Sequence, residues 1–311
     1  MPSKPPTITY INVSCNRLWT IRTLSYDGLR KIGEDEILDS LRRSGYLFES
    51  EITKTLSDFG FFVESNITSL DPLTGKNREI DLVAEYHREY DPEKAKAKVV
   101  AISRFVFEIK NNNSPFVLMT RFENSPHSEI YNGLKTAKTI PEKLKDVWFS
   151  DFFDLMFYSE PRKKLFTQYC SFSKKKNEEL MAHHPDNIYS AFQKITHFCE
   201  EQVEPYNKSN YKDEYFRNFV YLPVLLIKED LYELDYDEDD SPRLMKVESS
   251  QLVFNYHFKQ KPKTAIIFVM TKAGLEPFLR DTLNFEVAVE KNMLESKELY
   301  IKKAEKNKMS S

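Results

Sequence analysis

Hydrophobic and polar positions change their spacing along the chain, from a helical period to a strand period near residue 60. From about Glu34 to Asp58 the apolar residues recur at helical spacing, and the pair Ser44-Gly45 predicts that this stretch forms two helices. Gly60 indicates where the second helix ends. The apolar stripe of that helix consists of Phe48, Ile52, Leu56 and Phe59.

After Gly60 most apolar runs are short, and several alternate with polar residues, which is the pattern of β-strands. The run from Phe219 to Ile227 is apolar throughout, as in a strand that is buried on both faces. We predict strands at Phe61 to Ile67, Arg78 to Tyr86, Val99 to Lys110, Phe219 to Ile227, Leu231 to Leu234, Leu252 to Phe258 and Thr264 to Thr271.

The remaining segments give weaker patterns. Residues 7 to 23 alternate and predict an N-terminal hairpin. Asp186 to Pro205 and the chain from Leu275 onward have helical spacing, and the aromatic run from Trp148 to Tyr158 also predicts a helix. The acidic run from Asp235 to Asp240 predicts a solvated turn.

The composition restricts the classes of protein to which this chain can belong. Its 45 Lys and Arg residues are matched by 48 Asp and Glu residues, so the net charge of −3 argues against binding nucleic acid by bulk charge. Three widely spaced cysteines, with no Cys-x-x-Cys pair, indicate reduced thiols. The apolar runs are too short for a membrane span, and Met1 to Pro6 lacks the apolar stretch of a signal peptide. We therefore expect a cytoplasmic protein that does not cross a membrane.

Charged residues at the end of the third predicted strand indicate a reactive site. Alternate side chains of a strand share a face, so Glu108 and Lys110 point together while Phe105 and Phe107 point into the core. On the second predicted strand, Asp81 lies on the polar face. The residues expected on the opposite, apolar face of that strand are Ile80, Leu82 and Ala84.

If these two strands pair, Asp81 stands beside Glu108. Two neighbouring carboxylates repel each other unless a cation lies between them, and their oxygen atoms suit a hard ion such as Mg²⁺. A metal ion at this place would polarise a phosphoryl group and lower the pKa of a bound water. Lys110 would position that water or stabilise the developing charge. The combination predicts metal-dependent hydrolysis of phosphodiesters.

A third acid lies on the helix that precedes these strands. At about 100° per residue, Glu49 falls roughly 65° from the centre of the apolar stripe, and Glu51 falls about 95° away on the other side. We therefore expect Glu49 to face the sheet and Glu51 to face solvent.

The order of these motifs resembles the PD-(D/E)xK superfamily of phosphodiesterases, which has the restriction-endonuclease-like fold. By this resemblance Asp81 and Glu108 would hold Mg²⁺ or Mn²⁺, and Lys110 would be the catalytic lysine. Glu49 would be an accessory acid for the metal and for catalysis, and Gln193 would contact the metal-bound water or the phosphate. The matching segments are Phe48-Glu49 with Leu56 and Gly60, Arg78 to Ala84, Phe105 to Lys110 and, more weakly, Ala191-Phe192-Gln193 and Phe219 to Ile227.

The resemblance also implies a domain organisation. We expect a single elaborated α/β domain over residues 1 to 311, with a mixed central sheet flanked by helices, the N-terminal hairpin and extra C-terminal strands. The expected parts are a nuclease core at about 34 to 113 and 186 to 227, a helical insertion at about 114 to 185, and added strands and a helix at 228 to 311. No proline precedes Asp81, which departs from the pattern that names the superfamily.

The preferred function is therefore hydrolysis of nucleic acid, DNA in preference to RNA, and a homodimer would be needed to cut both strands at one place. Two alternatives stay open. A protein with this fold can bind nucleic acid or a partner protein without cutting, or the acids and lysine can form a structural ion-pair network on an exposed sheet face. The stretch from Pro161 to Lys176 is basic and aromatic without an acid, which predicts a further contact with a phosphate backbone and bases.

Overall fold

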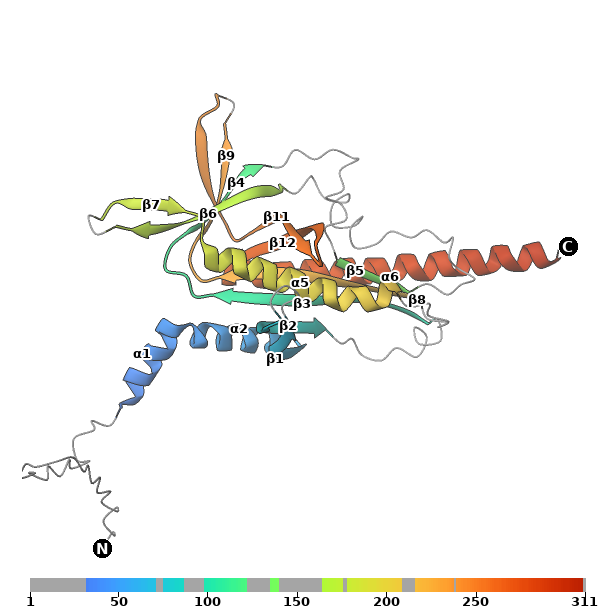
Figure 1. Cartoon of the computed structure of the whole chain (residues 1–311). Helices are drawn as coiled ribbons and strands as arrows, with labels where there is room; N and C mark the ends of the chain where they lie inside the picture. The colour runs from blue at the N-terminus through green and yellow to red at the C-terminus, as the bar shows by residue number, and fades with distance from the viewer. Residues whose placement is uncertain are drawn as a thin grey trace, which may run out of the picture.

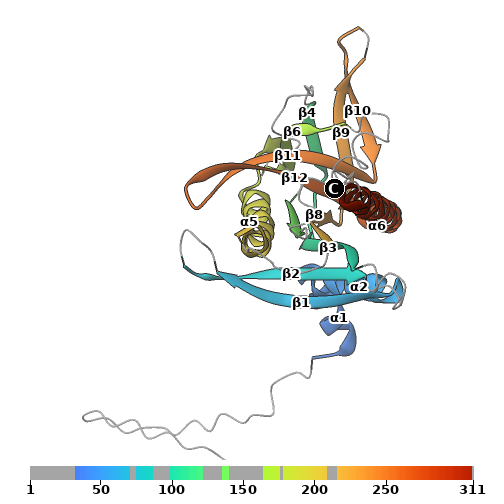
Figure 2. The same cartoon turned by 90° about the vertical axis from the view of Figure 1, so that its right-hand side faces the viewer.

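The computed structural model describes residues 32–70, 75–86, 98–121, 135–139, 164–175, 178–208, 216–237 and 239–309. Within these ranges the protein has a mixed α/β fold, in which a large mixed β-sheet is flanked by helices (Figures 1 and 2). The predicted fold class is confirmed at this level. The hairpin predicted at residues 7 to 23 and the helix predicted at 148 to 158 lie outside the described residues.

Two helices begin the described chain and meet at a corner. The first, α1 (Glu34–Ser44), ends at Gly45, whose φ of 93° is a left-handed conformation that glycine adopts without strain. The second, α2 (Tyr46–Asp58), follows at once and packs its apolar stripe against the sheet. The predicted break and the predicted stripe are both confirmed.

In the described part of the chain, twelve strands form the sheet, and ten of them follow one continuous path in the order β1-β2-β3-β8-β12-β11-β6-β4-β9-β10. All seven predicted strands are present. The strands are β1 (Phe61–Leu70), β2 (Asn77–Tyr86), β3 (Val99–Lys110), β4 (Phe116–Arg121), β5 (Lys135–Thr139), β6 (Phe166–Lys174), β7 (Leu180–His183), β8 (Phe216–Ile227), β9 (Leu231–Tyr236), β10 (Pro242–Val247), β11 (Ser249–Phe258) and β12 (Lys261–Thr271).

Strand β8 is central to the sheet. It pairs in parallel with β3 along its whole length and with β12 near its end, while β5 pairs antiparallel with its first half. Every residue from Phe219 to Ile227 is buried, as the continuous apolar run predicts. Because β3 is the parallel neighbour of β8, the end of β3 that carries Glu108 and Lys110 is fixed beside the most buried strand of the protein.

Where residues 114 to 185 are described, the elements are the strands β4, β5, β6 and β7, whereas the prediction for this insertion was helical. These runs hold between four and nine residues. Helices of that length are marginal, whereas a strand gains backbone hydrogen bonds from each neighbour. β5 pairs with β8, and β4 and β6 pair with β9 and β11, so these short runs extend the central sheet.

Helices cover both faces of the sheet. On one face α2 and α6 (Lys272–Met309) pack around Phe105 and Phe107, and on the other α5 (Asp186–Lys208) packs near Val106 and Leu225. Figure 2 shows α5 and α6 on opposite sides of β3 and β8. The inward direction predicted for the two phenylalanines is confirmed. None of the helices in the described ranges is long and apolar enough to cross a membrane.

Strand β2 changes its orientation at Asp81. Leu82 and Ala84 pack in the core beneath α2 and α6, whereas Ile80 packs in the core beneath α5. The prediction that these three residues share a face is therefore wrong. The reason is a local kink, because Asn66 on the paired strand β1 has a left-handed φ of 54°, which asparagine tolerates, and the pairing of β2 with β3 ends at Leu82. Asp81 thus lies where the two strands separate.

The start of α6 generates a prediction about stability. A Cβ atom on Gly274 would lie 2.2 Å from the carbonyl oxygen of Glu248, which also accepts a hydrogen bond from Thr271. We expect Gly274→Ala to lower the free energy of unfolding by about 1–3 kcal/mol because the backbone must move, as measured by urea denaturation. An ordinary Gly→Ala change within a helix stabilises by about 1 kcal/mol, so a gain in stability would contradict the close contact.

Candidate active site

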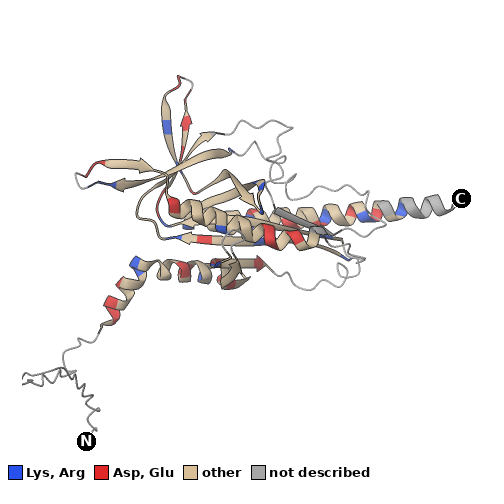
Figure 3. Cartoon of the chain, viewed as in Figure 1, with Lys and Arg blue, Asp and Glu red and all other residues tan. Residues whose placement is uncertain are grey.

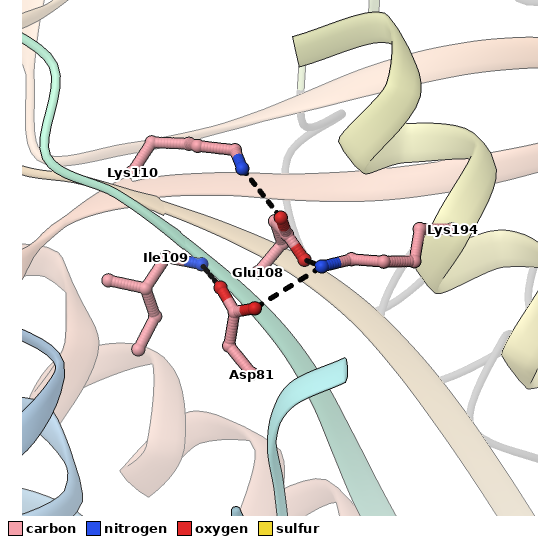
Figure 4. Close-up of polar contacts among 5 residues, drawn as sticks. All are labelled: Asp81, Glu108, Ile109, Lys110 and Lys194. Atoms are coloured by element: carbon pink, nitrogen blue, oxygen red, sulfur yellow. Dashed lines mark hydrogen bonds and ion pairs between the residues drawn. The ribbon is translucent and has the colours of Figure 1, made fainter. Parts of the chain in front are cut away.

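Two carboxylates from adjacent strands meet at the end of β3 (Figure 4). The Nζ atom of Lys194, on α5, lies 3.2 Å from Oδ1 of Asp81 and forms a closer ion pair with Oε2 of Glu108. On the other side, Nζ of Lys110 lies 2.6 Å from Oε1 of Glu108. Asp81 and Glu108 therefore share one cation, the Lys194 ammonium group. Lys110 lies on the same face as Glu108, as the strand alternation predicts.

A backbone hydrogen bond fixes the Asp81 carboxylate. The N–H group of Ile109 donates to Oδ2 of Asp81 at 2.7 Å. This bond lies just beyond Leu82, where the regular pairing of β2 with β3 ends. The side chain of Asp81 thus continues the connection between the two strands after their backbones separate, and its second oxygen stays directed at Lys194.

The site is largely buried and short of positive charge. The side chain of Glu108 is only 3% exposed, and those of Asp81 and Lys194 are 21% and 16% exposed. Burial raises the pKa of Glu108, and the neighbouring Asp81 raises it further, although Lys110 and Lys194 act in the opposite direction. The acids therefore do not lie on an exposed sheet face, which corrects that part of the ion-pair alternative.

Glu49 belongs to the same electrostatic environment. It lies in the first turn of α2, and burial raises its pKa most, followed by the charges of Asp81 and Glu108. Lys194 lowers the same pKa in part. Glu49 is half-buried and lies within electrostatic range of the two acids, whereas Glu51 is exposed and pairs with a lysine of α6 at 2.8 Å, as predicted for these two residues.

Asn111, directly after β3, fixes the helix corner that carries Glu49. Its Nδ2 atom donates to the carbonyl oxygens of Arg42 and Arg43 at 3.1 and 2.9 Å, at the end of α1. A Cβ atom on Gly45 would lie 3.0 Å from Cβ of Asn111, so the corner packs tightly against this side chain. Sequence reasoning missed Asn111, although its place immediately after Glu108-Ile109-Lys110 was a signal.

Sequence reasoning also missed Lys194, the helix residue that contacts both acids. The preceding residue, Gln193, instead donates to the hydroxyl group of Tyr189 at 3.3 Å, one turn earlier on α5. The role predicted for Gln193 stays a prediction. The signal for Lys194 was weak, because it is one of many lysines and lies 113 residues from Asp81.

The carboxylates of the site suit a divalent cation, on the condition that the cation displaces Lys194. Carboxylate oxygens are the ligands that Mg²⁺ and Mn²⁺ prefer. Burial raises the pKa values of Glu49 and Glu108, and the negative charge of the neighbouring acids raises them further. In the described part of the chain, however, no three His, Cys, Asp or Glu side chains are gathered as a ready metal site. The Lys194 ammonium group lies between the two carboxylates, so an ion that bridged them would have to displace it.

The stretch from Pro161 to Lys176, predicted to contact nucleic acid, has paired lysines and buried aromatic rings in its described residues. Within its described residues, Lys164 pairs with Asp235 at 2.5 Å, and Lys175 lies 3.6 Å from a glutamate. Phe166 and Tyr169 are buried, so they are not available to stack on bases. Acidic and basic residues are mixed on the helices and strands (Figure 3).

Comparisons with known proteins give no relative. No protein-family model, curated protein or solved structure matches the chain. The function is therefore inferred from the residues and from the geometry in which they meet.

The shared cation generates a prediction for Lys194. We expect Lys194→Ala to lower the free energy of unfolding by about 1–3 kcal/mol at pH 7 in EDTA, because it leaves two partly buried carboxylates without their common partner. Gln193→Ala is the matched control on the same helix and should change stability by no more than about 0.5 kcal/mol. Both are measured by urea denaturation, and equal losses in the two variants would count against the bridging role.

Glu108 generates a prediction about pH. Its raised pKa means that ionised Glu108 costs stability in the folded state, and this cost disappears as the pH falls to the ordinary value of 4.5. The stability of Glu108→Gln relative to the natural protein should therefore be greatest near neutral pH and decline on acidification. Urea denaturation at several pH values measures this difference, with the exposed Glu79→Gln on β2 as control. If the stability of Glu108→Gln relative to the natural protein rose on acidification, the folded protein would lower the pKa of Glu108, and the prediction would be wrong.

Proposed function

We propose that the protein is a metal-dependent nuclease that hydrolyses phosphodiester bonds of nucleic acid, DNA in preference to RNA. The observation that supports this most is the convergence of Asp81 and Glu108 on one cation, with Lys110 bound to the same glutamate. The order of the elements also agrees with a restriction-endonuclease-like core. A helix with Glu49 precedes the strand with Asp81, the strand with Glu108 and the helix α5 that closes the site.

Asp81, Glu108 and Glu49 would hold the Mg²⁺ or Mn²⁺ ion. Such an ion, when bound, polarises a phosphoryl oxygen and lowers the pKa of a bound water. The chain itself contributes fixed geometry, since the N–H group of Ile109 holds Asp81 and the buried surroundings of Glu108 restrict its side chain. Preorganised charges of this kind act more strongly in a water-poor site than they do in solvent.

The two lysines contribute positive charge from opposite sides of Glu108. The side chain of Lys110 is 24% exposed, so its ammonium group is accessible to a water or to a phosphate oxygen while it remains near Glu108. Lys194, displaced by the ion from between the two carboxylates, would bring a second charge from α5. Both can stabilise the negative charge that develops on a phosphoryl group, and Lys110 can also orient the attacking water.

One observation favours the alternative of a protein that binds without cutting. Lys194 already lies between the two carboxylates and offsets their repulsion. A fold stabilised in this way needs no metal, and the chain could then bind nucleic acid or a partner protein through another surface. The two functions differ in a measurable property, which is whether the carboxylates accept a divalent ion.

The nuclease proposal predicts cutting that depends on metal and on these side chains. Purified protein is incubated with single-stranded, double-stranded and branched DNA and with RNA, in Mg²⁺, Mn²⁺ or EDTA. We expect Asp81→Asn and Lys110→Ala to lower the cutting rate at least about 100-fold, because each removes a group that acts on the reacting phosphate. Glu51→Gln, an exposed acid of α2, should leave the rate unchanged. Cutting that persists in EDTA or in Asp81→Asn would refute the proposal.

A second measurement tests the metal site without a substrate. Mn²⁺ should raise the melting temperature of the natural protein, because an ion that binds only the folded state stabilises it. The shift should vanish in Asp81→Asn and persist in Glu51→Gln. Binding of nucleic acid without cutting, together with no Mn²⁺ shift, would instead support the non-catalytic alternative.

A further inference from the structure

A cavity of about 790 Å³ lies on the α5 face of the sheet, between the β1–β2 hairpin and the second half of α5. Figure 2 shows α5 above this hairpin. Phe198, which lines the cavity, lies four residues after Lys194 on α5, so the cavity begins about 6 Å along the helix from the candidate active site. None of the acids and lysines of that site lines the cavity.

Arg104 supplies unused hydrogen-bond donors to the cavity. Its Nε atom donates to Glu85, its Nη1 atom donates to the hydroxyl group of Tyr221 at 2.7 Å, and its guanidinium group lies 5.4 Å from the ring centroid of Phe219. A guanidinium group has five N–H donors. Among the described residues no partner is present for the remaining three, which include both on Nη2. Arg104 is therefore held in place by two of its donors and has three left for a ligand in the cavity.

The charge of the lining excludes an anion as the occupant. Among the described lining residues, three glutamates, Glu64, Glu85 and Glu201, stand against one cation, Arg104, so this part of the lining carries two net negative charges. Glu201 accepts a hydrogen bond from Ser69 on Oε2 at 2.8 Å, which leaves Oε1 for a further donor. The matching ligand is neutral, with acceptors for Arg104 and donors for the carboxylates.

The apolar part of the lining fits a planar ring. Phe62, Val83 and Phe198 contribute to the cavity from β1, β2 and α5. A nucleobase is a planar, neutral group with donors and acceptors on its edges, and proteins bind unpaired bases by stacking them on such side chains. Guanine carries two adjacent acceptors, O6 and N7, which are the atoms that arginine donors recognise, and an amino group that can donate to a carboxylate.

We infer that this cavity binds an unpaired base of the nucleic acid, guanine in preference to the other bases, next to the phosphate held at the candidate active site. The inference rests on the proposed nuclease function, because the base would belong to the nucleic acid that the enzyme cuts. It identifies Arg104 as the residue that selects guanine and Glu201 as the acceptor for its amino group. The remaining lining supplies the stacking surface.

Neutral nucleosides test the cavity directly. Guanosine, adenosine, cytidine and uridine are titrated into the full chain in EDTA, and binding is measured by calorimetry. We expect guanosine to bind at least tenfold more tightly than the others and guanosine monophosphate to bind no more tightly than guanosine. Arg104→Gln should weaken guanosine binding at least tenfold, because one arginine–guanine pair contributes that much discrimination. Arg280→Gln, which removes an exposed arginine paired with Glu276, should leave the affinity unchanged.

Phe62→Ala provides a second variant if Arg104→Gln does not fold, since Phe62 is 58% exposed and its loss leaves the core intact. It should also weaken guanosine binding. No binding of guanosine, equal binding of the four nucleosides, or an affinity unchanged in both folded variants would overturn the inference.

Asp81→Asn separates this inference from the nuclease proposal. The variant should bind guanosine like the natural protein, because Asp81 does not line the cavity. Guanosine binding without any cutting would keep the guanine site and refute the nuclease proposal. Metal-dependent cutting without guanosine binding would refute the guanine site alone.

Discussion

The site depends on one electrostatic constraint, which is that two neighbouring carboxylates cannot be buried together without a positive charge between them. At a separation of 4 Å two like charges repel by about 1 kcal/mol in water and by about 4 kcal/mol at an effective dielectric constant of 20. Lys194 meets this constraint because it reaches Asp81 on β2 and Glu108 on β3 at once. The same contact joins α5 to β2 and β3, so the position of a helix and the chemistry of the acids are coupled.

Local sequence patterns predicted the elements that carry the site, whereas long-range packing determined which side chains meet there. The alternation of β3 placed Glu108 and Lys110 on one face, and the helical stripe of α2 placed Glu49 within electrostatic range of the acids. Neighbouring residues on a helix point about 100° apart, so a modest rotation of α5 decides whether Gln193 or Lys194 faces the sheet. That rotation depends on contacts between residues far apart in the sequence, which periodicity alone does not contain.

The kink at Asp81 shows a second limit of the same reasoning. A period of two assumes an unbroken strand, and it placed Ile80 on the wrong face, because the left-handed Asn66 on β1 interrupts the regular pleat. The interruption has a functional consequence. A regular strand would have continued the backbone pairing with β3, whereas the kinked strand leaves the Asp81 side chain to accept the hydrogen bond from Ile109 and to contact Lys194. The strand pattern therefore breaks at Asp81, which is the residue that completes the site.

The charge balance of the site connects metal and substrate in the proposed function. When all are ionised, three carboxylates and two ammonium groups, those of Glu49, Asp81, Glu108, Lys110 and Lys194, leave one net negative charge. A phosphodiester alone would meet a site of its own sign, whereas a divalent ion changes the net charge to one positive, which a single phosphate neutralises. Metal and nucleic acid should therefore bind with positive coupling, each increasing the affinity for the other by the same factor. A chain with a net charge of −3 can thus bind a polyanion at one local site without a basic surface.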